Sequence, residues 1–406
     1  MLQKQNIKIA HLIGGKFVGG IERDFSEFIN YSYKNVHHFV ITKNRLHPLI
    51  SKNILNTVEN IFSMNYLGNI KIPKLISILK SKFIGYKIKF IGPPDIWLLW
   101  SIFPNYLLSL TQNSKMIYYD HGKAWYKKGF NSKNIKFLNR VDMIICVSNA
   151  AKRMLELKWG ITNKNVKIIY NALRLTCKPE NQTTKSINKN KPLNIGIAGR
   201  HISFKGFSLM LYTVSELKKR KVPCKLFIAG VGNTTDDLMR LVTKLNLEDD
   251  VKFLGLVEDM KEFYSQIDLF ICPSIREPFG LVNIEAMAHG CPVIVAGVDG
   301  MPEILDGANA GFVIKPTLEI EKYPEFGGSL DLLKEVEYVY DPYTDTIIRP
   351  RILNPLHIAD AIEELWSNPD QFSEMSKNAI QLVNEKFDYE KHVEELYEVI
   401  TETIKK

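Results

Sequence analysis

The second half of the chain alternates short, continuous apolar runs with longer amphipathic segments. Apolar runs of this length are typical of strands buried on both faces, and most of the segments between them have the length of helices. Strands alternating with helices predict a parallel sheet covered on both faces, which is a doubly wound α/β domain. The expected strands are 193–198, 225–229, 251–254, 268–272, 292–296 and 311–314, and the expected helices are 206–221, 236–245, 258–266 and 281–289.

The first half repeats this rhythm less sharply and predicts a second doubly wound domain. The fold class is therefore α/β, with two Rossmann-like domains. Ligands of such sheets bind at the carboxyl ends of the strands, so we expect the site in a central cleft between the domains. The expected strands are 7–13, 36–42, 95–100, 115–119, 142–147 and 166–170, and the expected helices are 20–33, 73–82, 103–110 and 149–158.

Two stretches of the chain depart from the alternating pattern. Residues 172–191 hold almost no apolar side chains and are expected to link an N-terminal domain, 1–171, to a C-terminal domain, 192–386. Residues 317–355 have no clear period, and we expect them to form a loop or small hairpin inserted in the second domain. Helices at about 356–367, 369–386 and 389–404 are expected to close the chain.

Composition narrows the class of protein. The chain has 406 residues, which favours two domains, and no apolar run approaches the roughly 18 residues of a membrane-spanning helix. The apolar run near the N-terminus is too short for the core of a signal peptide. The five cysteines are scattered without metal-site spacing, which fits a reducing cytosol and disfavours a disulfide framework.

The net charge of +9 conceals a strong asymmetry between the two halves. Residues 1–190 hold 30 Lys and Arg against 9 Asp and Glu, whereas the remaining residues hold 23 against 35. A basic first half predicts an anionic partner, such as nucleic acid, anionic lipid or a phosphorylated substrate. The lysine-rich amphipathic segment 69–93 favours contact with an anionic membrane surface, and no recognition motif supports nucleic acid.

Two glutamates stand in the most informative stretch, PSIREPFGLVNIEAMAHGCPVIVAGVDGMP, residues 273–302. Glu277 follows a predicted buried strand, at a turn set by Pro278 and Gly280, and Glu285 lies near the start of the next helix. The turn leaves free backbone N–H groups and the positive end of a helix at the carboxyl end of the strand, which favours an anion. The two carboxylates are spaced to accept hydrogen bonds from two hydroxyl-rich parts of one ligand.

This stretch resembles the E-x7-E signature of the family-4 retaining glycosyltransferases, enzymes of the GT-B fold that use nucleotide-sugar donors. The resemblance implies that Glu277 contacts the donor sugar and that Glu285 contacts the ribose of the nucleotide. It also implies that the backbone amides of Phe279, Gly280 and Leu281 reach the sugar or the phosphate.

A second match is IGIAGRHISFKG, residues 195–206, which resembles the GR…KG loop of the same family. The resemblance places Arg200 and Lys205 on the donor diphosphate. Two cations at a strand end stabilise the charge that a leaving diphosphate gains. Gly230, in LFIAGVG, matches a further strand-end glycine of the family, where a ligand can approach closely.

The first domain carries a glycine-rich loop, GGKFVGGIER, between its first strand and a helix. Such a loop is typical of phosphate binding, and this one is similar to the glycine-rich loop of the family's acceptor-side domain. Gly15, Gly19 and Gly20 are therefore expected to bind the donor. His121, in YYDHG, follows a strand end where the family places a histidine that faces the donor sugar.

The loop after His121 allows two interpretations. Lys123, Trp125 and Tyr126 fit a sugar-stacking surface beside a phosphate or carboxylate, and they fit equally well a solvated loop with one anchored aromatic. The resemblance implies retaining sugar transfer to a glycan or glycolipid acceptor, with His121, Glu277, Arg200 and Lys205 as the catalytic group. It further implies that residues 387–406 form a helix that crosses back to the first domain.

No cofactor and no metal are expected, because no DxD motif lies near the site. A nucleotide-sugar epimerase or a glycan phosphorylase of the same fold are alternatives, although no lysine can be assigned to bind pyridoxal phosphate. A non-catalytic protein that binds nucleotide sugars is a third. Basic charge and the resemblance favour synthesis of a bacterial surface glycan, such as lipopolysaccharide or capsule, in the cytoplasm at the inner face of the plasma membrane.

Overall fold

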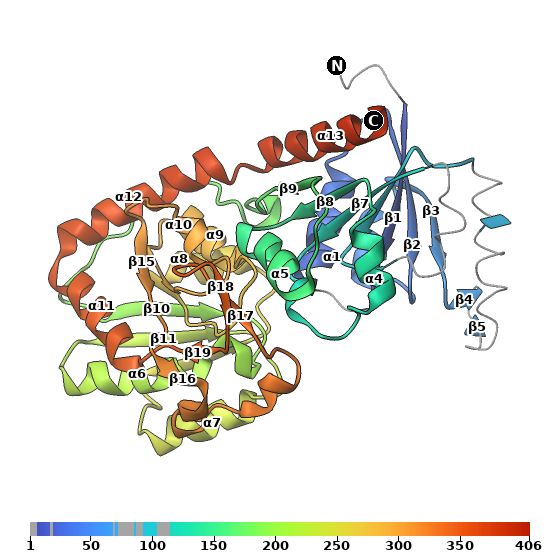
Figure 1. Ribbon diagram of the computed structural model, residues 1–406. Coiled ribbons are helices and arrows are strands. Elements are labelled where there is room, and N and C mark those ends of the chain that lie inside the picture. The colour runs from blue at the N-terminus through green and yellow to red at the C-terminus, as the bar shows by residue number, and fades with distance from the viewer. Residues whose placement is uncertain (1–5, 17–18, 68–69, 72–84, 87–91, 104–113) are drawn as a thin grey trace.

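Two parallel sheets, one in each half of the chain, form the framework of the protein (Figure 1). The computed structural model describes residues 6–16, 19–67, 70–71, 85–86, 92–103 and 114–406. Every neighbouring pair of strands in the first sheet is parallel. In spatial order these strands are β3 (Val58–Ser63), β2 (Val36–Thr42), β1 (Ile7–Ile13), β6 (Ile96–Trp100), β7 (Lys115–Asp120), β8 (Met143–Cys146) and β9 (Val166–Ile168).

The second sheet is also parallel throughout. In both sheets the chain starts in the interior and then moves outward in both directions, so the strand order reverses beside the first strand. This confirms the expected α/β class with two doubly wound sheets. In spatial order the strands are β12 (Val251–Gly255), β11 (Cys224–Ala229), β10 (Leu193–Ala198), β13 (Leu269–Cys272), β14 (Val293–Ala296) and β15 (Gly311–Ile314).

Capping interactions fix where the covering helices begin and end. At one helix start the Ser148 hydroxyl accepts a 3.0 Å hydrogen bond from the Ala151 N–H, and Gly160 ends the same helix with a left-handed φ of +62°. The α-helices are α1 (Gly20–Asn30), α2 (Pro48–Ile54), α4 (Ser132–Leu138), α5 (Asn149–Trp159), α6 (Phe207–Lys219), α7 (Thr235–Lys244), α8 (Met260–Gln266), α9 (Leu281–Ala288), α10 (Pro302–Leu305), α11 (Pro355–Ser367), α12 (Pro369–Lys386) and α13 (Tyr389–Lys405). Three short 3-10 helices are η3 (Lys123–Trp125), η4 (Leu175–Cys177) and η5 (Ser203–Lys205).

The last helix, α13, returns to the first half of the chain and packs beside its sheet (Figure 1). The Tyr397 ring stacks on Phe28 of α1, with 5.4 Å between ring centroids. The Tyr397 hydroxyl also shares a 2.7 Å hydrogen bond with Ser32. The final segment of the chain therefore packs into the core of the first half.

A chain of buried polar side chains runs from Trp100 towards α13. The Trp100 indole N–H can only donate, and it donates to Nδ1 of His11 at 3.2 Å, so the proton of the neutral His11 ring sits on Nε2. That Nε2 lies 2.8 Å from Nδ1 of His38, whose own Nε2 lies 2.6 Å from the Ser32 hydroxyl. Burial lowers the pKa of both histidines, that of His38 to about 3. Both rings are therefore neutral, each in a single tautomer.

The expected insertion, 317–355, forms two small antiparallel pairs and two 3-10 helices, so it includes the small hairpin that its sequence indicates. The hairpin contacts α5 of the first half, where the Arg153 guanidinium grips the Asp345 carboxylate through bonds of 2.8 Å and 2.9 Å. The insertion thus bridges the two halves. Its elements are β16 (Leu318–Glu319), η6 (Ile320–Phe326), η7 (Leu330–Lys334), β17 (Val339–Asp341), β18 (Thr346–Ile348) and β19 (Arg351–Ile352).

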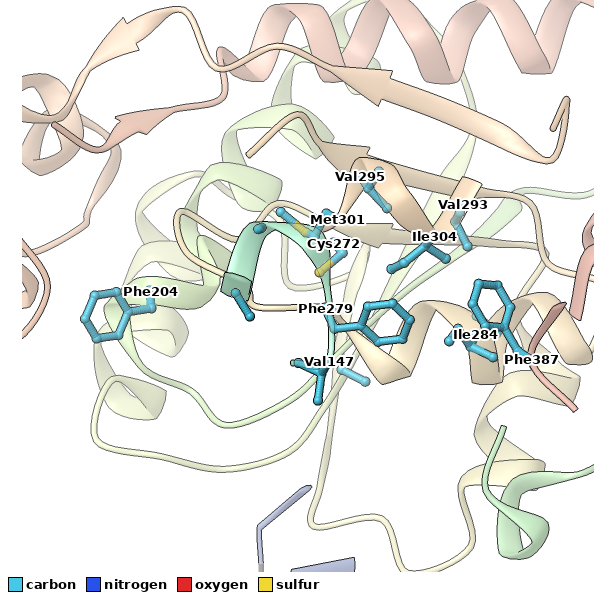
Figure 2. Packing of buried hydrophobic residues seen from close by; sticks show 14 of the residues in the cluster. Val147, Phe204, Cys272, Phe279, Ile284, Val293, Val295, Met301, Ile304 and Phe387 are labelled. Atoms are coloured by element: carbon cyan, nitrogen blue, oxygen red, sulfur yellow. The ribbon is translucent and has the colours of Figure 1, made fainter. Parts of the chain in front are cut away.

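Apolar side chains fill the space around the turn after β13 (Figure 2). The Phe279 ring is buried and packs against Tyr170 and Phe387, with centroid distances of 5.6 Å and 6.0 Å.

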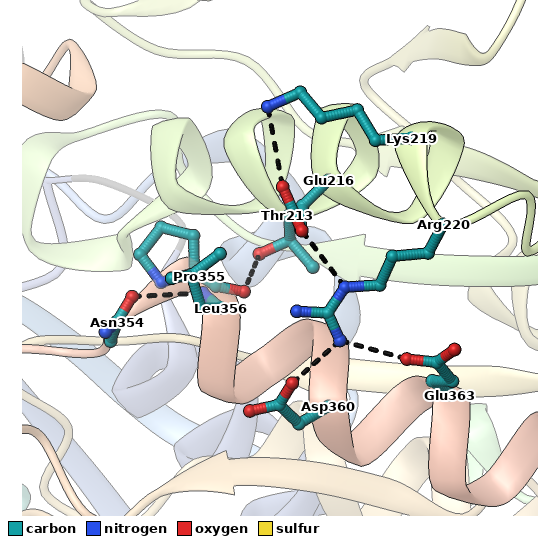
Figure 3. Close-up of polar contacts among 9 residues, drawn as sticks. All are labelled: Thr213, Glu216, Lys219, Arg220, Asn354, Pro355, Leu356, Asp360 and Glu363. Carbon is teal, nitrogen blue, oxygen red and sulfur yellow. Dashed lines mark hydrogen bonds and ion pairs between the residues drawn. The ribbon is translucent and has the colours of Figure 1, made fainter.

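Elsewhere in the second half, Arg220 holds α6 to α11 (Figure 3). Its guanidinium binds Asp360 at 2.7 Å and Glu363 at 3.0 Å. Arg220 therefore joins two helices that pack directly against each other.

The apolar pattern does not predict β3, α2 or α4. The edge strand β3 has no fully buried residue, so its sequence lacks the apolar signal of a central strand. The expected helices 73–82 and 103–110 and the basic segment 69–93 lie largely outside the described residues. In the part of the chain that the structure describes, no helix is long and apolar enough to cross a membrane.

Candidate active site

Lys205 and Glu277 form an ion pair at the carboxyl edge of the second sheet. Lys205 ends η5, which follows β10, and Glu277 lies in the turn after β13, the neighbour of β10. The two side chains keep 22% and 13% of their surface exposed. Burial disfavours the lysine charge, but the Glu277 carboxylate outweighs it and raises the pKa of Lys205. A charged ammonium is therefore held where an anionic ligand can meet it.

The loop that carries His121 packs against the Glu277 turn from the other half of the chain. Gly122 has a φ of +97°, and a Cβ atom at this position would lie 2.3 Å from Cγ of Pro278. The residue after His121 and the residue after Glu277 are thus in direct contact. The sequence places these residues in separate domains, and the structure brings their loops together.

The His121 imidazole packs against two aromatic rings, which also contact each other. Its centroid is 5.3 Å from the ring of Trp100 and 4.0 Å from that of Tyr119. Burial lowers the pKa of His121 to about 3, so the ring is neutral at physiological pH. Its Nε2 atom is buried and has no hydrogen-bond partner among the described residues. An atom of this kind can bond to a hydroxyl group of a ligand.

The structure decides between the two interpretations of the loop after His121. Trp125 is fully buried, and its indole N–H donates to Asp299 at 2.8 Å, so this ring is the anchored aromatic and offers no face to a sugar. Oδ1 of Asp120 accepts hydrogen bonds from the backbone N–H groups of Gly122 and Lys123 at 2.6 Å and 2.7 Å. The loop is therefore fixed at both ends.

Arg276, which the motifs do not single out, joins the two halves beside Glu277. Its Nη2 donates to the carbonyl of Gly122 at 2.6 Å. Its guanidinium lies over the rings of Trp125 and Tyr126, at 5.1 Å and 4.7 Å from their centroids. In the sequence, only its position next to Glu277 indicates that Arg276 belongs to the site.

Glu285 lies apart from the Lys205–Glu277 pair. Its carboxylate is completely buried, with one oxygen bound by Arg174 and the other accepting a 2.9 Å hydrogen bond from the Tyr264 hydroxyl. Burial works against the Arg174 charge, but the negative charges of Glu285, Cys177 and Asp24 together raise the pKa of Arg174. The residue expected to contact ribose is thus engaged by other side chains. Arg174 lies in the connection between the halves, where no motif marks it.

The remaining residues expected to bind the donor differ in their accessibility. Arg200 is exposed, and none of the described carboxylates pairs with it. Phe279 presents its backbone only, because its ring is buried. Gly280 has a φ of +97° and directly precedes α9, whose first turn begins at Leu281. The first N–H groups of a helix have no partner inside the helix, so this edge can receive an anion.

The glycines have different structural roles. A Cβ atom at Gly230 would lie 1.9 Å from the Gly199 carbonyl oxygen, and one at Gly15 would lie 2.8 Å from a methyl group of Leu46. Gly19 donates its N–H to the Glu22 carboxylate at 3.1 Å. A Cβ atom at Gly20 would meet nothing within 4 Å. Gly230 and Gly15 are thus required by the fold itself, whereas Gly20 borders open space.

Metal ligands are not grouped in the described part of the chain: no three His, Cys, Asp or Glu side chains there are placed to hold an ion.

Two family models match the chain side by side. Residues 18–176 match the glycosyltransferase family 4 model, and residues 178–325 match the model for glycosyl transferases group 1. An uncharacterized glycosyltransferase of Methanocaldococcus jannaschii is 31% identical over 183 residues, which cover 43% of this chain and 47% of that protein. The chain spans about half the length of the curated relatives it matches.

Solved structures share the architecture over nearly the whole chain. A glycosyltransferase from Rickettsia africae superposes with a TM-score of 0.76 at 19% identity, covering 98% of this chain and 99% of that one. Anabaena HepE in complex with UDP superposes with a TM-score of 0.73 at 17% identity, covering 98% and 100%. With its two doubly wound sheets in the GT-B arrangement and both family models matched, the chain belongs to glycosyltransferase family 4.

Proposed function

We propose that the protein transfers a sugar from a nucleotide-sugar donor to a glycan or glycolipid acceptor, with retention of the anomeric configuration. The observation that carries this proposal is the Lys205–Glu277 ion pair, which lies at a strand edge where a diphosphate and a sugar can bind next to each other. The loop of His121 faces this pair from the first half of the chain.

The residues take distinct roles in the proposed reaction. Lys205 binds the diphosphate of the donor, with Arg200 beside it, and both stabilise the negative charge that grows as the glycosidic bond breaks. Glu277, released from Lys205 by the incoming phosphate, accepts hydrogen bonds from the sugar hydroxyls. The acceptor hydroxyl attacks from the face that the diphosphate leaves, and the diphosphate takes its proton. The neutral His121 ring bonds to the donor sugar.

Glu285 contacts the ribose in this proposal only after Arg174 releases it. The carboxylate is completely buried in the structure, and Arg174 lies on the connection between the halves. A change in the relative position of the halves on donor binding therefore provides a route by which the carboxylate becomes accessible.

An acceptor that carries a phosphate or carboxylate group fits the charges of the first half. Burial lowers the pKa of Lys123, the Asp120 carboxylate opposes this, and the positive charges of Lys128, Lys43 and Arg276 lower the pKa further. None of these four cations forms an ion pair with a carboxylate among the residues that the structure describes, and the remaining residues of the chain include no Asp or Glu. Repulsion among them is relieved when an anionic group binds.

We place this reaction in the synthesis of a bacterial surface glycan, such as lipopolysaccharide or capsule, at the inner face of the plasma membrane. The basic first half supports this assignment. The protein should bind vesicles that contain anionic lipid, and salt should weaken this binding. Binding that is indifferent to lipid charge would remove the membrane from the proposal and leave the transferase assignment intact.

The proposed activity is tested with a panel of UDP-, GDP- and ADP-sugars. UDP-sugars come first, because HepE was solved with UDP. We expect one donor to raise the melting temperature and to release its nucleotide slowly in the absence of acceptor. The Lys205→Met variant should release the nucleotide about 100-fold more slowly or slower still. A donor that stabilises the protein but is never cleaved would instead indicate a protein that only binds nucleotide sugars.

A further inference from the structure

Asp299 is a buried carboxylate in the loop between β14 and α10. It is fully buried and has a φ of +53°, a left-handed backbone conformation that costs an L-residue about 1 kcal/mol or more and costs glycine nothing. No described Lys, Arg or His lies within ion-pair distance of it. Burial raises its pKa to about 7. The left-handed backbone and the buried carboxylate both cost free energy, so other interactions of Asp299 must offset this cost.

Three N–H groups from three separate segments converge on this one side chain. The Trp125 indole and the backbone N–H of Tyr340 both donate to Oδ1 at 2.8 Å. The backbone N–H of Glu277 donates to Oδ2 at 3.0 Å. These donors belong to the loop after β7 in the first half, to β17 of the insertion and to the Glu277 turn. A carboxylate is the side chain that offers acceptors on both oxygens.

Within its own half the Glu277 turn is also bonded through the Ile275 N–H to the Phe204 carbonyl at 2.8 Å and through the Gly300 N–H to the Glu277 carbonyl at 3.3 Å. Its two neighbours are held from the first half, Arg276 through the Gly122 carbonyl and Pro278 through a 2.7 Å hydrogen bond from Ser148. The Glu277 N–H donates to Asp299, which belongs to the second half. The Trp125 indole of the first half donates to the same carboxylate.

We infer that Asp299 is a positioning residue that makes the placement of Glu277 depend on the docking of Trp125 and β17. When the first half and the insertion are docked, Trp125 and Tyr340 hold the Asp299 carboxylate in place. Asp299 then fixes the Glu277 backbone so that the Glu277 carboxylate contacts Lys205. When they separate, Asp299 loses two of its three donors and the turn is released. This inference rests on the proposed function for its catalytic consequence.

The first test replaces Asp299 with glycine, which keeps the left-handed backbone without strain and removes only the carboxylate. We expect kcat to fall about tenfold or more, because a small displacement of a catalytic group has effects of this size. Trp125→Phe removes one donor and keeps the ring under Arg276, and it should lower kcat by about threefold. In the Asp299→Gly/Trp125→Phe double variant the second change should add nothing further. Independent, multiplicative effects would overturn the inference.

A second readout does not depend on any activity. Hydrogen–deuterium exchange of the peptide 273–281 should be faster in both single variants, because the Glu277 N–H has lost or loosened its acceptor. The control is Ser32→Ala, which removes a hydrogen bond between the first half and α13 and involves neither Asp299 nor β17. It should leave this exchange unchanged. Unchanged exchange in Asp299→Gly, or equally fast exchange in the control, would refute the positioning role even if no donor is ever found.

Discussion

The Lys205 ammonium and the Glu277 carboxylate neutralise each other in the structure, although they arise from two different strands of the sheet. Each is the other's only ion-pair partner within the described residues. A donor diphosphate would take the place of Glu277 next to Lys205 and would free the carboxylate for the sugar. The pair therefore keeps two groups charged and partly buried until the ligand that needs both of them arrives.

Replacement of Lys205 with methionine should lower kcat by about 100-fold or more, because it removes a positive charge from the leaving diphosphate. The control is Lys219→Met, which changes an exposed lysine of α6. It should change kcat by less than twofold. Steady-state release of the nucleotide measures both variants, and a near-normal rate for Lys205→Met would contradict the assigned site.

Glu285→Ala should weaken donor binding and also destabilise the fold by about 3–5 kcal/mol, since Arg174 is then left buried without its partner. Arg174→Met/Glu285→Gln removes both charges and should be less destabilised than the sum of the two single changes. Urea unfolding measures stability, and the donor-induced rise in melting temperature measures binding. If the effects of the two changes on stability were additive, the pair would have no energetic coupling.

His38 should contribute less to stability as the pH is lowered below about 6.5, because its ring stays neutral in the folded state, whereas the raised pKa of a buried carboxyl such as Asp299 acts in the opposite direction. The pKa of His38 is about 3 when folded and about 6.5 when unfolded, so the unfolded chain binds more protons between these values. His38 alone should cost about 2 kcal/mol at pH 5 relative to pH 8. His38→Asn should reduce this slope in urea unfolding, and the exposed His357→Asn should not. An unchanged slope in His38→Asn would show that other groups dominate.

Two glycine substitutions should separate folding from ligand contact. Gly230→Ala places a methyl group 1.9 Å from the Gly199 carbonyl and should destabilise the protein by about 3 kcal/mol or more. Gly20→Ala has open space at the start of α1 and should leave the melting temperature unchanged or slightly higher. If the donor approaches this loop, Gly20→Ala weakens donor binding at full stability. Normal donor affinity in Gly20→Ala would remove Gly20 from the site.

The sequence was sufficient to predict the parts of the fold and site that follow from local pattern. Strands β1 and β10 have the bounds that their apolar runs predict, and Lys205 lies beside Glu277 because each follows one of two adjacent strands. The edge strand β3 could not be predicted in this way, because strand recognition depends on burial that an edge strand lacks.

The unpredicted parts of the site are contacts between residues far apart in the chain. Arg174 and Glu285 are separated by 111 positions, and Trp125 and Asp299 by 174. Arg174 lies outside the motifs, and Asp299 lies within the stretch 273–302 without being singled out there. Their contacts form only when the two halves meet. For the same reason Trp125 resembles a sugar-stacking residue in the sequence, whereas the structure buries it against the other half.

The return of α13 to the first half has a consequence for how the protein is made. The Tyr397 ring stacks on Phe28 and its hydroxyl bonds to Ser32, at the end of the polar chain, and Tyr397 leaves the ribosome hundreds of residues after them. The first half therefore emerges with an apolar face open and completes its core only after the second half has been synthesised. Separate expression of residues 1–171 should accordingly yield an aggregating fragment, and co-expression of a peptide spanning α13 should rescue it.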